Sequence, residues 1–238
     1  MKFTQPLVEG RLLRRYKRFL ADVELADGAV ITCHCPNTGS MLGCADPGLR
    51  VWLSRSDNPK RKYAHTWELV ETSDAVTVGI HTGRTNDIVA EAIRDGHLPE
   101  LSGYGSLRRE VTVPDAPMRA DFLLSEHDNG AADCFVEAKN VTAAVEAGIA
   151  LFPDAVSSRG TRHLEVLAGL SRQGGRAALV FCVQRGDVRE VRPADEIDPE
   201  YGRALRRAIS HGVEVSALCA DVSPAGLRAA ECVPVVCP

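Results

Sequence analysis

Apolar and polar residues alternate along roughly the first 80 positions of the chain, which is the pattern of half-buried β-strands. Arg18–Leu25 alternates over most of its length, and Asp27 and Gly28 then predict a hairpin turn into residues 29–35. No convincing amphipathic helix interrupts this region. About five short strands in such a length suit a small closed barrel, of which the OB-fold is the commonest form. Further strands are predicted at Leu49–Ser54, Tyr63–Val70 and Ala75–Ile80.

After Thr82 the pattern changes to alternating helices and strands. A first helix is expected to be capped by Thr85 or Asn86 and to end at Gly96. A second is expected from about Ala155 to Arg172, with Asp154 as its N-cap. A third is expected to begin at Asp198-Pro199 and to end at Gly212. The first of these helices has an apolar stripe of Ile88, Val89, Ala92 and Ile93.

The strands of this second region include one that is almost purely apolar, Arg176–Val183, as expected at the centre of a sheet covered on both faces. The pattern predicts an α/β domain with a mixed sheet. We therefore expect two domains, residues 1–81 and 82–238, packed against each other because no low-complexity linker separates them. The other strands are predicted at Ser106–Val113, Asp121–Ser125, Cys134–Ala138 and Val213–Cys219.

Composition adds that this is an ordinary globular chain, with 238 residues of which 45% are hydrophobic and 25% charged. No apolar run approaches the ~20 residues needed to cross a bilayer, and the first residues lack the apolar segment of a secretory signal. We expect a cytoplasmic protein without a membrane partner. The eight cysteines show no CxxC or Cys/His zinc spacing, so reduced, mostly buried thiols are expected.

Charge is distributed unevenly between the two regions. Residues 1–70 hold 11 Lys+Arg against 7 Asp+Glu, whereas the remainder holds 17 against 25. The net charge of −4 therefore conceals a basic barrel followed by an acidic domain. A basic module of this kind favours contact with nucleic-acid phosphates.

The residues with the clearest chemistry are Asp121, Glu137 and Lys139. Side chains two apart on a strand share a face, so Glu137 and Lys139 point the same way and Ala138 the opposite way. If the two strands form an antiparallel hairpin, Asp121 and Glu137 meet at the same end of neighbouring strands. Two carboxylates with one backbone carbonyl are the hard oxygen ligands that Mg²⁺ or Mn²⁺ prefers. Lys139 would then orient a water molecule or stabilise developing charge.

An alternative remains open, because this spacing arises often by chance and a Glu/Lys pair on one strand face is usually a solvated pair. Glu91, three residues after Ile88, is a third acid that flanks the buried stripe of the first helix and is a candidate for the same site. Asp154 is explained by capping. Arg159 and His163 share one helix face and would either clamp a phosphate or be solvated, and Gln184 ends the central strand near the mouth of such a site.

The barrel offers two cationic clusters beside aromatic residues, a combination suited to phosphate contacts with base or sugar stacking. Each cluster alone is also compatible with an ordinary solvated surface. One surrounds Tyr16 and the other precedes Tyr63. The candidate nucleic-acid-binding residues are Arg14, Arg15, Lys17, Arg18, Lys60, Arg61 and Lys62, together with Arg159 and His163.

Five longer motifs make the chain recognisable, and they run in order along essentially its whole length. The motifs are Leu13–Asp22 (LRRYKRFLAD), His34–Gly39 (HCPNTG), Tyr104–Val111 (YGSLRREV), Glu137–Thr142 (EAKNVT) and Phe152–Val156 (FPDAV). They closely resemble the sugar fermentation stimulation protein family, SfsA.

This resemblance implies an N-terminal OB-like domain and a C-terminal domain of the PD-(D/E)XK nuclease superfamily. Carried over by position, the nuclease-type motif falls on Asp121, Glu137 and Lys139, with Glu91 as the upstream helix acid; Ala138 stands where valine is commoner. The resemblance also implies DNA binding, with a regulatory role in sugar (maltose) utilisation.

Three functions follow from these observations. The first is a DNA-binding, regulatory protein that contacts phosphates through its barrel, since no helix-turn-helix signature predicts specific readout. The second is a Mg²⁺-dependent nuclease that uses Asp121, Glu137 and Lys139. The third is a protein that does not bind nucleic acid and whose acids only stabilise the fold. Because all three site residues are present, the nuclease function stays open beside DNA binding.

Overall fold

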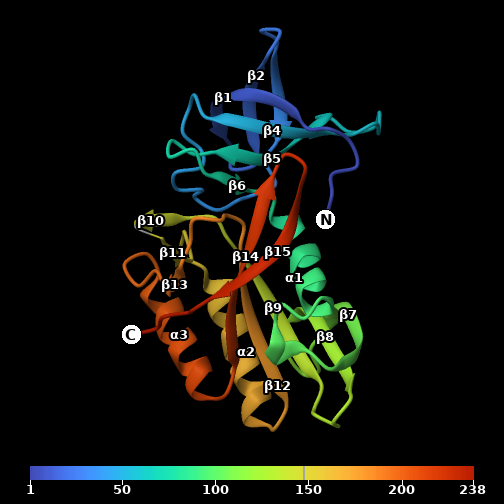
Figure 1. Cartoon of the computed structure of the whole chain (residues 1–238). Helices are drawn as coiled ribbons and strands as arrows, with labels where there is room; N and C mark the ends of the chain where they lie inside the picture. Colours follow the sequence, from blue (N-terminus) through green and yellow to red (C-terminus); the bar gives the residue numbers. More distant parts are fainter. Residues whose placement is uncertain (147) are drawn as a thin grey trace.

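The computed structural model describes residues 1–146 and 148–238, with side chains described outside 144–147. A β-barrel formed by the first part of the chain sits above an α/β part formed by the rest (Figure 1). The β14–β15 hairpin rises from the α/β part to the barrel, beside strands β5 and β6 (Figure 1). The two predicted regions therefore fold as distinct architectures in contact with each other.

The barrel is built from antiparallel neighbours in the order β3-β2-β1-β4-β5-β6, and a pairing of β3 with β5 closes it. Its interior is filled by alternate residues of each strand, among them Leu12, Val23 and the fully buried Trp67. The predicted small closed barrel is confirmed. Its strands are β1 Val8–Tyr16, β2 Leu20–Leu25, β3 Val30–His34, β4 Arg50–Arg55, β5 His65–Glu71 and β6 Thr77–Gly79.

The α/β part contains a six-stranded mixed sheet in the order β15-β14-β12-β9-β8-β7. Strand β12 lies parallel to β9 and β14 on either side, and the outer pairs are antiparallel. The predicted mixed sheet, with Arg176–Val183 buried at its centre, is confirmed. The strands are β7 Tyr104–Thr112, β8 Arg119–His127, β9 Cys134–Val141, β12 Arg176–Val183, β14 Glu214–Ser223 and β15 Gly226–Val233.

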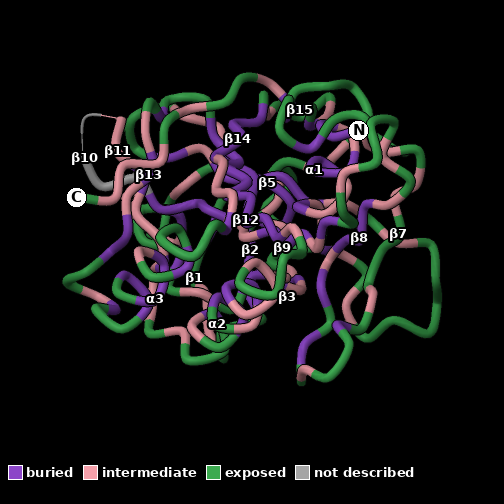
Figure 2. The backbone as a smooth tube through the Cα atoms, turned by 90° about the horizontal axis from the view of Figure 1, so that it is seen from below, coloured by how far each residue is buried: buried purple, intermediate pink, exposed green. Residues whose placement is uncertain are grey.

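Helices cover both faces of this sheet. Helix α1, Thr85–Arg94, packs its predicted apolar stripe against one face, where Phe122, Val136 and Val180 lie. Helices α2, Ser158–Arg172, and α3, Pro199–Ser210, cover the other face. The central strands are accordingly buried and the surrounding loops exposed (Figure 2).

The remaining elements lie at the edges of this core. Strands β10, Ala144–Glu146, β11, Ile149–Phe152, and β13, Glu190–Pro193, form a small separate sheet. Two short 3₁₀ turns, η1 at Thr82–Arg84 and η2 at Pro99–Leu101, flank α1.

Two of the predicted helix caps are wrong. Thr85 and Asn86 do not cap α1, because their side chains bond Asn140 and Asp121. The N-cap residue is Arg84, which makes no side-chain capping bond. Ser157, rather than Asp154, caps α2, and its hydroxyl accepts from the amide of Gly160.

The third predicted cap is confirmed: the carboxylate of Asp198 accepts from the amide of Tyr201, and α3 begins at Pro199. Gly96 and Gly212 both take positive φ just beyond the helices that they end. These are the positions at which left-handed backbone favours glycine.

Backbone and side-chain contacts join the two parts directly. The amide of Gly79, at the end of β6, donates to the carbonyl of Gln184, at the end of β12, at 2.8 Å. A Cβ at position 79 would lie 2.4 Å from Oε1 of Gln184, so a larger residue there would displace the Gln184 side chain. Trp52 and Leu69 of the barrel also belong to the core beneath α1.

The eight cysteines are free, and six of them are buried, as the sequence predicts for reduced thiols. Among the described residues no helix is both long and apolar enough to cross a membrane. Strands β1, β10, β11, β13 and β15 were not predicted from the sequence.

Candidate active site

The β8–β9 hairpin brings the predicted acids together. Phe122 pairs with Val136 in antiparallel register, so one step further along the two strands Asp121 and Glu137 leave the same end of the pair. Ala138 belongs to the core beneath α1, whereas Glu137 and Lys139 face the side covered by α2. The predicted distribution of side chains between the two sheet faces is found.

Asp121 is held by groups from two elements. Its Oδ2 accepts from the amide of Ala138 at 2.8 Å, and its Oδ1 accepts from Nδ2 of Asn86 at 2.9 Å. Burial and the neighbouring charge of Glu137 raise the pKa of Asp121 above 3.8, and the bonds to Ala138 and Asn86 only partly offset them. A positive charge placed beside Asp121 would therefore stabilise its ionised form.

Glu137 is almost fully buried and has two partners on one oxygen. Its Oε1 lies 2.5 Å from Nζ of Lys139 and 2.6 Å from Nδ1 of His163 on α2. Burial by itself would raise the pKa of Glu137, but the bond to His163 and the charge of Lys139 outweigh it, and the pKa falls below 4.5. Glu137 is therefore a permanently charged carboxylate at neutral pH.

His163 takes its orientation from both ring nitrogens. Nε–H of Arg159 donates to Nε2 of His163 at 3.3 Å, which leaves Nδ1 as the nitrogen that donates to Glu137. The two residues predicted to share a helix face therefore act as a pair. Arg159 stands beside the cleft, and His163 lies against the acid.

These residues line one open cleft of about 750 Å³. Both parts of the chain contribute to it, because Thr38 comes from the barrel and the remaining residues from the α/β part. The cleft is lined by Thr38, Thr82, Gly83, Thr85, Asn86, Asp87, Arg109, Glu110, Asp121, Glu137, Ala138, Lys139, Asn140, Phe152, Arg159 and His163.

Several lining residues were not predicted as parts of the site, among them Thr38, Asn86, Arg109 and Asn140. Asn140 directly follows the Glu-Ala-Lys sequence, which was the one local signal for it. Its Oδ1 accepts from Nε2 of Gln184 at 2.6 Å. Gln184 is fully buried behind Asn140 and does not line the cleft, in contrast to its predicted place near the mouth.

Glu91 does not join this cluster. Its Oε2 instead binds the amino group of Met1 at 2.7 Å, since α1 turns this side chain toward the N-terminal segment. Among the described residues there is no group of three or more His, Cys, Asp or Glu side chains placed to hold a metal ion. Beside Lys139 the cleft holds the carboxylates of Asp121 and Glu137; Asp87 and Glu110 also line it but are paired with arginines.

Asp154, the acid of the FPDAV motif, fastens a loop of the barrel to the α/β part. Its Oδ2 accepts from the amide of Met41 at 3.1 Å, and a Cβ on Gly39 would lie 2.5 Å from that same oxygen. From the barrel side, Arg15 donates to the carbonyls of Asn37 and Gly39. The loop that carries Thr38 into the cleft is thereby held from both sides.

Replacing Asp154 by alanine is expected to lower the free energy of unfolding by about 1–2 kcal/mol, because a charged acceptor is removed from a partly buried amide. Gly39→Ala is expected to destabilise as well, through the clash with the carboxylate. The double variant should lose less unfolding free energy than the two single variants together, since removing the carboxylate also removes the clash. Urea unfolding of the four proteins measures this coupling, and strict additivity would contradict the contact.

The predicted cations of the barrel lie at the end of β1 and in two loops. Lys17 and Arg18 form the β1–β2 turn with positive φ at both residues, and Arg18 donates to the carbonyl of Thr38. Arg14 is exposed, pairs with Asp22 and stacks on Tyr16. Arg15 is turned inward to the loop described above. Lys60, Arg61 and Lys62 are exposed in the β4–β5 loop.

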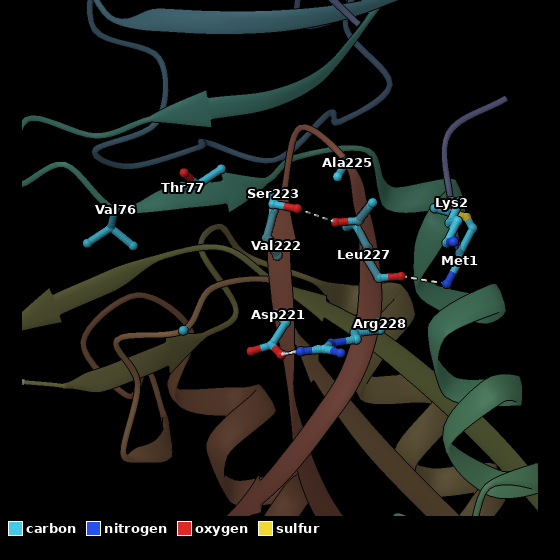
Figure 3. A pocket seen from close by; sticks show the side chains of 12 residues that line it. Met1, Lys2, Val76, Thr77, Asp221, Val222, Ser223, Ala225, Leu227 and Arg228 are labelled. Carbon is cyan, nitrogen blue, oxygen red and sulfur yellow. Dashed lines mark hydrogen bonds and ion pairs between the residues drawn. The ribbon is translucent and has the colours of Figure 1, made fainter. Parts of the chain in front are cut away.

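A second hollow of about 660 Å³ lies between the β14–β15 hairpin, the loop before β6 and the N-terminal segment (Figure 3). Its charged residues Asp221 and Arg228 pair with each other, and the hydroxyl of Ser223 bonds the backbone of the same hairpin. None of the predicted site residues lines it. This hollow is therefore separate from the predicted site.

Comparison with known proteins begins with the family models. Residues 83–226 match the model described as "Sugar fermentation stimulation protein RE domain", and residues 13–80 match "SfsA N-terminal OB domain". The chain belongs to the SfsA family. The resemblance inferred from the five motifs is confirmed, and so is the fold of an N-terminal OB barrel followed by an α/β part.

Members of the SfsA family match the whole chain. It is 62% identical over 238 residues to the "Sugar fermentation stimulation protein homolog" of Alkalilimnicola ehrlichii, with 100% of both chains covered. It is 65% identical over 228 residues to that of Halorhodospira halophila, covering 96% of this chain and 95% of the relative. A solved structure, described as Pyrococcus furiosus SfsA in complex with Ca²⁺, superposes with a TM-score of 0.86 at 28% identity and covers 99% of this chain and 98% of that one.

Proposed function

We propose that this chain is a divalent-metal-dependent nuclease of the PD-(D/E)XK type, which binds DNA across its barrel and hydrolyses a phosphodiester in the cleft. One observation carries the proposal: Asp121, Glu137 and Lys139, which come from adjacent strands, line one cleft together with Arg109 and Arg159. Two neighbouring carboxylates, one buried and one half-buried, whose pKa values are shifted in opposite directions are typical of a functional site.

The donor set fits Mg²⁺ or Mn²⁺. Two carboxylates and a neighbouring backbone carbonyl are hard oxygen ligands, and Mg²⁺ usually keeps several waters and substrate phosphate oxygens besides one or two protein carboxylates. A site of two acids is therefore sufficient for it. The Ca²⁺ of the similar Pyrococcus furiosus structure supports a divalent ion in this fold. When bound, the ion would neutralise the phosphate charge and lower the pKa of a water molecule.

Other residues of the cleft would position the water and bind the phosphates. Lys139, fixed by Glu137, places an ammonium group where it orients a water or stabilises charge on the phosphate. Arg159 and Arg109 at the cleft offer guanidinium groups to the flanking phosphates. His163 holds the carboxylate of Glu137 in place from α2.

The barrel supports DNA as the substrate. In OB-folds the loops between strands 1 and 2 and between strands 4 and 5 flank the face that binds oligonucleotides. In this chain those two loops carry Lys17 and Arg18, and Lys60, Arg61 and Lys62. Their charges would add sequence-independent phosphate contacts.

Two measurements test the proposal. Mg²⁺ or Mn²⁺ is expected to raise the thermal unfolding midpoint, because an ion that binds only the folded state stabilises it by about 3 kcal/mol at a hundred times its dissociation constant. The purified protein is also expected to cleave single- or double-stranded DNA only when the ion is present. Absence of both effects in wild-type protein would contradict the proposal.

A second candidate is DNA binding without cleavage, in the service of the sugar-utilisation role that the family name describes. The observation in its favour is that Oε1 of Glu137 already has two partners, Lys139 and His163, without an ion. A protein that binds DNA, does not respond to divalent ions and leaves all substrates intact would establish it. A role in regulating maltose utilisation would then be tested by measuring expression of the maltose-utilisation genes in cells that lack the gene for this protein.

A further inference from the structure

A small pocket lies on the outside of the barrel, apart from the catalytic cleft. It has a volume of about 200 Å³ and is lined by His34, Arg61, Lys62 and Tyr63. At about 30 Å³ for each water molecule, this is room for roughly seven waters, which is the size of one nucleobase rather than of a base pair.

The lining residues are held in place by their own contacts. Nη2 of Arg61 donates to Oγ1 of Thr66 at 2.9 Å, and Nζ of Lys62 lies 5.5 Å above the ring centre of Tyr63. His34 ends strand β3, where its backbone pairs with Thr66. Burial and the charge of Arg61 lower the pKa of His34, so that its ring is neutral at pH 7 and offers one donor and one acceptor.

The chain runs directly from this pocket to the catalytic cleft. His34 is followed by the loop that carries Thr38, a residue of the cleft lining, and four residues of chain span at most about 14 Å. The same loop touches the start of the α/β part, where Oγ1 of Thr82 donates to the carbonyl of Pro36 at 2.7 Å. A strand bound in the pocket would therefore lead into the cleft within a few nucleotides.

We propose that this pocket holds one unpaired nucleotide of the substrate strand, its base against Tyr63 and His34 and its phosphate at Arg61 and Lys62. This inference rests on the proposed function, because the strand held in the pocket is the one that would be cut in the cleft. A duplex keeps its bases stacked and paired, so the pocket selects nucleic acid with a single-stranded segment. Aromatic stacking with a flanking cation is how sequence-tolerant single-strand sites hold their bases.

The test compares fluorescein-labelled (dT)12 with a blunt duplex of the same length, by anisotropy in the presence of EDTA so that no strand is cut. Tyr63→Leu is expected to weaken binding of the single strand about fivefold or more and to change duplex binding by less than about twofold. Tyr63→Phe retains the ring and is expected to bind (dT)12 as wild type does. Arg207→Ala, an exposed cation on the distant helix α3, is the charge control and is expected to change neither affinity.

Equal loss for both substrates, or no loss for the single strand, would overturn the inference. The inference would also be overturned if free dTMP displaced (dT)12 at a concentration similar to that of the oligonucleotide, since the pocket would then bind a soluble nucleotide. Because binding is measured without an ion, this result stands apart from cleavage. If wild-type protein cuts nothing while Tyr63→Leu still loses single-strand affinity, the nuclease proposal fails and the nucleotide pocket remains.

Discussion

Replacing Glu137 by glutamine is expected to reduce DNA cleavage by at least about a hundredfold, because it removes a charged oxygen ligand and the partner of Lys139 at once. The same variant should lose the stabilisation by Mg²⁺ or Mn²⁺. Lys139→Ala should reduce cleavage to a similar degree but retain the response to the ion, since both carboxylates remain. Initial rates on labelled DNA and thermal unfolding with and without the ion separate the two roles.

The matched control is Glu110→Gln. Glu110 lines the same cleft, but it is exposed and its carboxylate pairs with Arg119 at 2.8 Å. Cleavage by this variant is expected to stay within about threefold of wild type. Cleavage that survives both Glu137→Gln and Lys139→Ala would mean that the reaction occurs elsewhere or in a contaminant.

Arg84→Ala is expected to cost roughly 3 kcal/mol of unfolding free energy, the largest stability effect that we anticipate from a single charge. Glu68 is only 1% exposed, and Arg84 donates to both of its oxygens, at 2.8 and 3.1 Å. Removing the guanidinium leaves a buried carboxylate that still accepts from the hydroxyl of Ser54 but has lost the cation that balances its charge. Urea unfolding measures the loss.

Two further variants isolate the cause. Arg228→Ala breaks the exposed pair with Asp221 and is expected to cost less than about 1 kcal/mol. Arg84→Leu combined with Glu68→Leu removes both charges and should recover much of the loss, since an apolar pair replaces a buried ion pair at little cost. A double variant as unstable as Arg84→Ala would show that packing, rather than an unpaired charge, causes the effect.

Elements with strong local signals were predictable from the sequence. The uniform apolar run of β12 indicated a central strand, and the stripe from Ile88 to Ile93 indicated the buried face of α1. Asp198 followed by Pro199 located the start of α3. In each case neighbouring residues alone determine the outcome, because periodicity and capping act over a few positions.

The strands that were missed depend on distant partners. Strand β1 is largely exposed along its length, with Leu12 as its one fully buried residue, so its alternation is weak, and it is defined by pairing with β2 and β4. Strand β15 is likewise fixed by its hairpin with β14 and by α1. Tertiary pairing of this kind leaves little trace in the local sequence.

For the site, two-residue periodicity on β9 and the hairpin register were sufficient to join Asp121, Glu137 and Lys139. They did not locate Glu91, whose direction depends on where α1 places it relative to the N-terminal segment. Asp154 fits the pattern of a helix cap but bonds the amide of Met41 on the other part of the chain. The partners of such side chains come from elsewhere in the chain, which local spacing cannot supply.

The bond between Gly79 and Gln184 has a consequence for how substrate enters. It joins the last barrel strand to the central strand of the large sheet, and Arg84–Glu68 and Asp154–Met41 bridge the same junction. These contacts brace the barrel against the α/β part, so the packing of the two parts sets the width of the cleft mouth. If nucleic acid is the substrate, as we propose, it would have to bend, fray or present a free end to enter, and its shape, more than its base sequence, would decide what is admitted.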